Sequence, residues 1–115
     1  LFTNNEASRF STGQANSPRG LYDQLRGVMA ANGDGGKQIW ATEFGEATSK
    51  VSEATQADRI RDFIVSWRTL DGAGPAFIYT TRDRSTGSAN PQDNYGVYRT
   101  DWTPKPAADV MRSLA

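Results

Sequence analysis

The chain has 115 residues, with thirteen basic and thirteen acidic side chains and neither cysteine nor histidine. A neutral chain of this length is typical of one domain with a modest core, and it offers no electrostatic footprint for nucleic acid or an anionic membrane. Without cysteine and histidine, disulfides, thiol nucleophiles, zinc-finger clusters and the usual histidine base are excluded, so acid–base chemistry must rest on Asp, Glu, Lys or Tyr.

The first sixteen residues are polar and without periodicity, which predicts an irregular loop. They carry neither an initiator Met nor the pattern of a signal peptide, so we expect the chain to begin inside a longer protein. A helix is predicted next, because Ser17-Pro18 has the form of an N-cap followed by proline in the first turn. Its apolar side chains recur at helical spacing before Asn32-Gly33 ends it: Leu21, Leu25, Val28 and Met29.

The segment from Ile39 to Glu43 predicts a short buried strand that ends on a carboxylate and breaks at Gly45. Side chains alternate along a strand, so Trp40 and Phe44 share one face and Ala41 and Glu43 the other. The bulky aromatic pair is expected on the side that packs against helices. Glu43 would then point the other way, at the carboxyl end of a strand, where α/β proteins bind ligands.

A second helix is predicted from Ser52, followed by a strand over residues 76–80 and a long polar loop over residues 81–94. The helix carries one apolar stripe: Ile60, Phe63, Ile64, Trp67 and Leu70. A brief extended piece is expected at Tyr95–Tyr98. The last helix should be capped by Thr103-Pro104 and should bury the apolar residues Ala107, Val110, Met111 and Leu114.

Helices and strands alternate along the chain, which favours an α/β fold with parallel strands joined by crossover helices. Two parallel strands with three helices leave sheet edges unpaired, because each strand would normally have a neighbour on both sides. We therefore expect residues 1–115 to be one incomplete piece of a larger α/β domain.

The run Trp40-Ala-Thr-Glu43-Phe-Gly45 resembles the seventh-strand motif of the retaining (β/α)8 glycoside hydrolases, in the cellulase-like clan that includes families five and thirty-nine. An ordered set of further segments is also similar to that clan over roughly residues 17–115: Phe77-Ile-Tyr79 as an eighth strand, Arg82-Asp83, the turn 93–98, and Thr103-Pro-Lys-Pro-Ala107 opening the last helix. The resemblance implies the carboxyl-terminal part of a TIM barrel, covering strands seven and eight, about a quarter of such a barrel.

The resemblance implies that Glu43 is the catalytic nucleophile of a retaining, double-displacement hydrolase. That mechanism needs two carboxylates about 5–5.5 Å apart and neither a metal nor an organic cofactor. The clan takes its acid/base from a Glu that follows Asn at the end of the fourth strand. Asn5-Glu6 has this form but lies too close to Glu43, since three βα units, on the order of a hundred residues, should intervene. The acid/base is therefore expected to be missing from this chain.

The other candidate residues lie around the same rim. Asp83 either binds sugar hydroxyls or pairs with Arg82 or Arg84, and we interpret Glu46 as a solvated loop charge. Tyr79 is the substrate-binding candidate, because the clan often places an aromatic, usually Trp, on its eighth strand to stack on sugars. Two tryptophans are assigned to packing instead: Trp67 to the helical stripe, and Trp102 to an anchor before the last helix.

The sequence thus predicts that the chain is part of a glycoside hydrolase, and that the whole enzyme cleaves glycosidic bonds in polysaccharides or oligosaccharides. The isolated chain is expected to be inactive. The alternative is a non-catalytic α/β carbohydrate-binding or interaction module; a nucleotide-binding domain is disfavoured, because no glycine fingerprint follows either strand. Expected partners are a carbohydrate and either the missing part of the barrel or a second copy paired through exposed strand edges. Secretion is implied by the resemblance alone.

Overall fold

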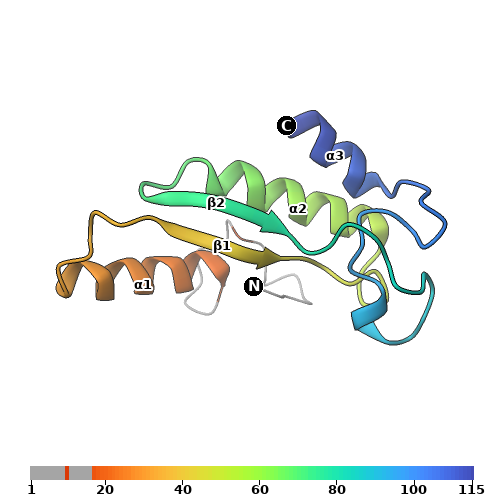
Figure 1. Ribbon diagram of the computed structural model, residues 1–115, viewed down its shortest axis with the longest axis horizontal. Coiled ribbons are helices and arrows are strands. Elements are labelled where there is room, and N and C mark those ends of the chain that lie inside the picture. The colour runs from red at the N-terminus through yellow and green to blue at the C-terminus, as the bar shows by residue number, and fades with distance from the viewer. Residues whose placement is uncertain (1–9, 11–16) are drawn as a thin grey trace.

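The computed structural model describes Phe10 and residues 17–115 (Figure 1). Its elements are α1 (Pro18–Ala31), β1 (Ile39–Phe44), α2 (Glu53–Trp67), β2 (Ala73–Ile78), the 3-10 helix η3 (Pro91–Asp93) and α3 (Pro106–Leu114). β1 and β2 are parallel neighbours, and α2 is the crossover between them. The predicted α/β arrangement of two parallel strands and three helices is confirmed. The loop expected over residues 1–16 falls, apart from Phe10, outside the described residues.

Serine caps start the first two helices where the sequence predicts them. Ser17 Oγ accepts a hydrogen bond from the Gly20 amide at 3.1 Å, and Ser52 Oγ accepts one from the Thr55 amide at 3.0 Å. These bonds satisfy amides that have no partner inside a first helical turn.

The cap predicted for α3 at Thr103-Pro104 is wrong, because the helix begins two residues later with Lys105 as its N-cap. Pro104 is engaged in an antiparallel bridge with Tyr98, and the Lys105 amide donates to the Val97 carbonyl at 3.0 Å. The chain therefore stays extended up to Lys105, and Pro106 takes the first helical turn, where its missing N–H costs nothing. The extended piece predicted at Tyr95–Tyr98 is seen as the bridges that Tyr98 makes to Arg82 and Pro104.

An aromatic core lies between the sheet and α2. The rings of Phe44 on β1 and Phe63 on α2 are stacked 4.1 Å apart, and Trp67 meets the ring of Tyr22 from α1 edge to face at 5.3 Å. Trp67 is only 5% exposed, so its predicted place in the core is confirmed. α3 packs against α2 and buries Ala107 and Val110, as Figure 1 shows at the carboxyl-terminal end of the chain.

β1 departs from the predicted alternation of faces. Ala41 and Phe44 are both buried, whereas Trp40 is 58% exposed and Glu43 is exposed. The pairing register with β2 shifts between Ala41 and Phe44, so strict alternation is interrupted there. The expectation that Trp40 packs with Phe44 against the helices is therefore wrong. Because of the shift, Phe44 rather than Glu43 follows Ala41 into the core.

β2 begins at Ala73, three residues before its predicted start, and ends at Ile78. The Gly74-Pro75 pair, expected to precede the strand, lies inside it. Proline has no N–H to give to a sheet, and the Gly74 carbonyl accepts a hydrogen bond from Trp67 Nε1 at 2.8 Å. Gly74 also allows the Trp40 ring to lie close by, since a Cβ at this position would stand 2.6 Å from Trp40 Cδ1.

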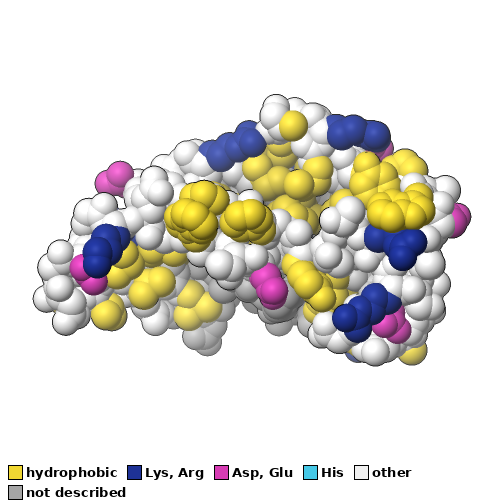
Figure 2. Space-filling view, viewed as in Figure 1, with side chains coloured by type: hydrophobic (Ala, Val, Ile, Leu, Met, Phe, Trp, Pro, Cys, Tyr) yellow, Lys and Arg dark blue, Asp and Glu magenta, His cyan; other side chains and the backbone are white. Residues whose placement is uncertain are grey.

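Large apolar side chains remain exposed on α1 and on the strands. Figure 2 shows hydrophobic side chains gathered over these elements on one face of the molecule. The most exposed are Leu21, Leu25 and Val28 of α1, Trp40 of β1 and Phe77 of β2. The predicted helical stripe of α1 is thus present but faces solvent, because among the described residues no strand follows β1 on that side of the sheet.

Candidate active site

Glu43 lies at the carboxyl end of β1, where its side chain is exposed. It is at one end of a groove of about 210 Å³ between α1 and β1, whose lining includes Leu21, Leu25 and Trp40. In parallel α/β folds this end of a strand is where catalytic groups are found. The carboxylate is therefore accessible to a ligand at the edge of the sheet.

Gly45 brings the end of β1 against the end of β2. The Tyr79 amide donates to the Phe44 carbonyl at 2.7 Å, and a Cβ at Gly45 would stand 2.1 Å from the Tyr79 carbonyl oxygen. No side chain larger than hydrogen fits this contact without a shift of backbone. Glycine at this position thus fixes the distance between the segment that carries Glu43 and the segment that carries Tyr79. The peptide bond between Tyr79 and Thr80 is cis.

Tyr79 is half-buried and packs against Tyr95, a residue that sequence reasoning did not single out for the site. The two rings meet edge to face with centroids 5.6 Å apart, and Tyr95 is 4% exposed. Burial raises the pKa of Tyr95 above its ordinary value, and the negative charge of Glu46 adds to the effect. The prediction that Tyr79 contacts a sugar stays a prediction. Tyr95 already contacts part of the Tyr79 ring.

Glu46 is fully buried, so its interpretation as a solvated loop charge is wrong. Its Oε1 accepts a hydrogen bond from Arg59 Nη1 of α2 at 3.0 Å, with both side chains almost completely buried. The backbone carbonyl of Glu46 accepts from Gln56 Nε2 at 3.0 Å, and the same nitrogen donates to the Gly96 carbonyl at 3.2 Å. α2 thus ties the loop after β1 to the loop after β2.

Asp83 is 1% exposed and forms a buried ion pair with Lys105 rather than with Arg82 or Arg84. Its Oδ1 accepts hydrogen bonds from Lys105 Nζ at 2.9 Å and from the Gly96 amide at 2.8 Å, and its Oδ2 accepts one from Thr86 Oγ1 at 2.8 Å. A sugar hydroxyl would reach this carboxylate only by displacing these donors. Asp83 therefore has a structural role in linking these segments, and its predicted contact with sugar stays a prediction.

Lys105 is the residue that sequence reasoning missed most clearly. It is fully buried, and its Nζ donates to Thr48 Oγ1 at 2.9 Å in addition to Asp83. It therefore links the loop after β1, the loop after β2 and the start of α3. The only sequence signal was its place in the Thr103–Ala107 motif, which did not distinguish a buried lysine from a surface one.

The carboxylates near this rim thus divide into two kinds. Glu43 is exposed, whereas Glu46 and Asp83 are buried in ion pairs with Arg59 and Lys105. A ligand can reach an exposed carboxylate directly, while a buried and paired one is committed to the fold. Asn5-Glu6, considered above as a second carboxylate, lies outside the described residues.

Within Phe10 and residues 17–115, no group of three or more acidic side chains is arranged to hold a metal ion. In the same part of the chain, no helix combines the length and apolar character that crossing a membrane requires.

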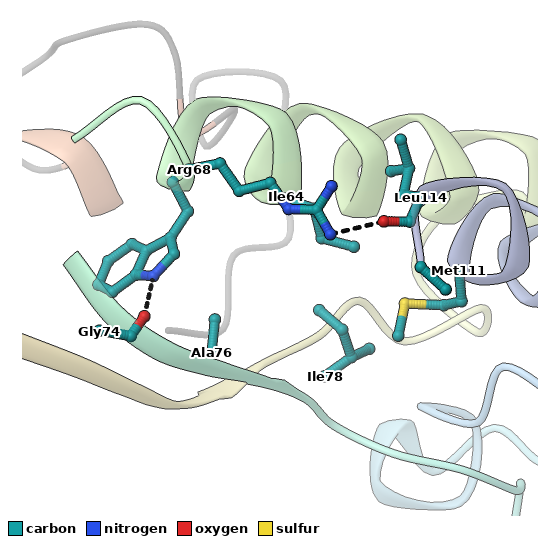
Figure 3. Close-up of a pocket in the computed structure, with 9 residues that line it drawn as sticks. Ile64, Arg68, Gly74, Ala76, Ile78, Met111 and Leu114 are labelled. Carbon is teal, nitrogen blue, oxygen red and sulfur yellow. Dashed lines mark hydrogen bonds between the residues drawn. The ribbon is translucent and has the colours of Figure 1, made fainter.

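A second hollow, of about 320 Å³, lies between α2, β2 and α3 (Figure 3). Its wall is mainly apolar and takes Ile64 from α2, Ile78 from β2, and Met111 and Leu114 from α3; in Figure 3 the Met111 and Ile78 side chains lie on facing sides of the hollow. Arg68 Nη2 donates to the Leu114 carbonyl at 2.5 Å along one side. Glu43 does not line this hollow, so it is separate from the candidate site.

No protein-family model matches the chain, and neither does any curated protein sequence. Solved structures do match. A family 39 glycoside hydrolase from the gut symbiont Bacteroides cellulosilyticus WH2 is 25% identical, with a TM-score of 0.60 over 68% of this chain and 16% of its own. A family 2 β-galacturonidase from Eisenbergiella tayi, bound to glycerol, is 21% identical, with a TM-score of 0.65 over 80% of this chain and 19% of its own.

The β-glucuronidase of Faecalibacterium prausnitzii is 14% identical, with a TM-score of 0.60 over 99% of this chain and 20% of its own. The chain therefore spans between 16% and 20% of the lengths of these proteins. Its two parallel strands and three helices match one part of glycoside hydrolase structures. At 21% and 14% identity, the likeness to the last two proteins concerns the fold alone.

Proposed function

We propose that this chain forms part of the catalytic domain of a retaining glycoside hydrolase and supplies its nucleophile, Glu43. The observation that carries the proposal is the exposure of Glu43 at the carboxyl end of a parallel strand, while Glu46 in the loop after β1 and Asp83 in the loop after β2 are buried in ion pairs. The likeness to part of glycoside hydrolase structures supports it.

In the proposed reaction, a carboxylate oxygen of Glu43 attacks the anomeric carbon of the sugar. A bond forms between that carbon and the oxygen of Glu43 while the glycosidic bond breaks. A carboxylic acid about 5–5.5 Å away protonates the leaving oxygen, and then removes a proton from the water that releases the sugar. We propose that this second group comes from strands outside the 115 residues. Tyr79 would offer its ring to the sugar from the neighbouring strand.

The remaining strands would also supply most of the substrate cleft. We therefore expect the isolated chain to hydrolyse nothing detectable, because the loss of an acid/base group alone costs about 10²–10⁴ in rate. Turnover of an aryl glycoside by the purified chain would contradict this. The sequence upstream of Leu1 also tests where the acid/base comes from. We expect it to contain a strand ending in Asn-Glu, on the order of a hundred residues before Glu43.

The decisive test uses a chimera in which residues 17–115 replace the corresponding segment of the family 39 hydrolase. Glu43→Gln should lower kcat by about 10³-fold or more, the scale expected when a covalent nucleophile is lost. A 2-fluoro aryl glycoside should leave its sugar on a peptide that contains Glu43, as read by mass spectrometry.

Glu46→Gln is the matched control, because it alters an acidic side chain three residues away that is buried and paired. It should weaken the fold and leave the labelled residue unchanged. Wild-type activity in the Glu43→Gln chimera, or a label on another residue, would contradict the proposal. The non-catalytic alternative would then be favoured.

A further inference from the structure

Trp102 is 57% exposed, although its position before α3 predicts a packing anchor. Its backbone has a φ of 67°, the left-handed region that a bulky side chain seldom adopts. Both observations concern the loop between β2 and α3, away from the groove beside Glu43, whose lining does not include Trp102. The prediction of a packing anchor is wrong, and the exposed ring requires another explanation.

A tight turn holds the ring outward. The Trp102 amide donates to the Arg99 carbonyl at 2.9 Å, and the Arg99 amide donates to the Thr103 carbonyl at 2.9 Å. Asp101 Oδ1 accepts hydrogen bonds from the Thr103 amide at 2.9 Å and from Thr103 Oγ1 at 2.6 Å. These bonds lower the pKa of Asp101 below its ordinary value. The hydrogen bonds on both sides of Trp102 thus hold its backbone at the positive φ.

Arg82 and Tyr98 also contact the Trp102 ring. The guanidinium carbon of Arg82 lies 4.8 Å from the ring centroid, and the Tyr98 ring lies 6.1 Å away at an angle of 55°. A cation and the face of an aromatic ring attract each other, so the Arg82 guanidinium limits the rotation of the Trp102 ring. Figure 2 shows hydrophobic and basic side chains next to each other at this end of the molecule. More than half of the tryptophan surface nevertheless stays in solvent.

A polar cavity of about 340 Å³ adjoins this turn, lined by Ser85, Thr86, Arg99, Thr100 and Asp101. The hydroxyls of Thr86 and Thr100 lie 3.1 Å apart on its wall. Arg82 Nη1 donates to the Thr100 carbonyl at 3.3 Å, so the side chain that stacks on Trp102 also contacts the segment that lines the cavity. Residues 99–102 therefore bring together the Trp102 ring, the Thr100 hydroxyl, the Asp101 carboxylate and the Arg99 guanidinium, which also pairs with Glu53 at 2.6 Å.

We propose that Trp102 and this cavity form a carbohydrate-binding site separate from the site of Glu43. A pyranose has an apolar C–H face that suits an aromatic ring, and hydroxyls at its rim that suit hydroxyl, carboxylate and guanidinium partners. One sugar unit stacks on the face of the Trp102 ring that Arg82 leaves open, while its hydroxyls reach the cavity. Only the choice of carbohydrate as the ligand rests on the proposed function. Binding at this site does not depend on the catalytic role of Glu43.

The test measures binding of xylo-, cello- and galacturono-oligosaccharides to the purified 115-residue chain, by nuclear magnetic resonance and by tryptophan fluorescence. Trp102→Gly should weaken binding about tenfold, the upper range for one aromatic contact. Glycine adopts a positive φ without steric cost, so this variant keeps the turn. Trp102→Phe keeps a ring and should recover most of the affinity.

Phe77→Ala is the control, because Phe77 is a comparably exposed aromatic residue that lines neither the groove beside Glu43 nor this cavity. It should bind sugars like the wild type. The proposal is overturned if no oligosaccharide binds saturably, if Trp102→Gly binds like the wild type, or if Phe77→Ala causes the same loss. Failure of Glu43 as nucleophile leaves this binding unchanged, so the two proposals fail separately.

Discussion

Lys105 Nζ lies 2.9 Å from Asp83 Oδ1, and both side chains are completely buried although 22 residues separate them in the chain. A buried charge is tolerated when a partner of opposite charge and hydrogen bonds surround it. Removing one partner leaves the other charge buried without compensation, which is strongly destabilising. The pair therefore holds the loop after β2 against the start of α3 as long as both members are present.

Lys105→Met should lower the free energy of unfolding by about 3–5 kcal/mol, since it leaves Asp83 buried without its cation. The double variant Lys105→Met with Asp83→Leu should be less destabilised than the single one. Arg19→Met is the control: it breaks the exposed pair with Asp23 and should cost about 0–1 kcal/mol. Urea unfolding measures all three, and equal costs for Lys105→Met and Arg19→Met would contradict the interpretation.

Two glycine-to-alanine variants should change stability in opposite directions. Gly45→Ala should destabilise by about 1–3 kcal/mol or more, because its Cβ would collide with the Tyr79 carbonyl oxygen. Gly27→Ala lies inside α1 with nothing within 4 Å of the new Cβ, and should stabilise by about 0.5–1 kcal/mol. Thermal or urea unfolding gives both values. A neutral Gly45→Ala would mean that the contact between the two strand ends gives way easily.

Stability should fall at alkaline pH through buried tyrosine. Burial raises the pKa of Tyr95, and also that of Tyr22, above the ordinary value of 10.0. The folded chain then holds these protons more tightly than the unfolded chain. Their contribution is complete below about pH 10 and is lost as pH rises through the folded-state pKa values. In Tyr95→Phe, the loss of unfolding free energy between about pH 8 and about pH 11 should be smaller than in the wild type, with Tyr22 accounting for part of what remains.

The exposed apolar side chains predict association of the isolated chain. Trp40 and Phe77 are 58% and 52% exposed on neighbouring strands whose outer edges have no strand partner among the described residues. Surfaces of this kind pair with other chains. Sedimentation velocity should show concentration-dependent oligomers, and Trp40→Lys with Phe77→Lys should reduce them. A wild-type chain that stays monomeric from micromolar to millimolar concentration would contradict this expectation.

Local signals predicted the helices and the parallel strands well. Ser17-Pro18 and Ser52 fixed two helix starts, and the alternation of elements identified the crossover. The predictions that failed concern side chains whose partners lie far away in the chain. Glu46 and Asp83 could not be recognised as buried, because their partners follow 13 and 22 residues later.

Local backbone irregularities account for the other failures. A register shift in β1, which periodicity cannot show, reversed the side on which Trp40 lies. A left-handed backbone turned Trp102 outward where a packing role was expected. The position of Glu43 at the end of its strand was predictable from the motif. The ion pairs that surround the rim were not.

The start of β2 has a consequence for how a sheet can grow beside it. Pro75 brings no amide hydrogen, and the Gly74 carbonyl is already held by the indole of Trp67. The Gly74 carbonyl and the Pro75 nitrogen point to opposite edges of the strand, so a strand added at the open edge of β2 lacks one regular backbone partner at this point. Pairing is complete only further along β2, which favours a neighbour offset toward the carboxyl end. Such an offset, repeated in one direction, is the shear that lets a sheet curl round and close.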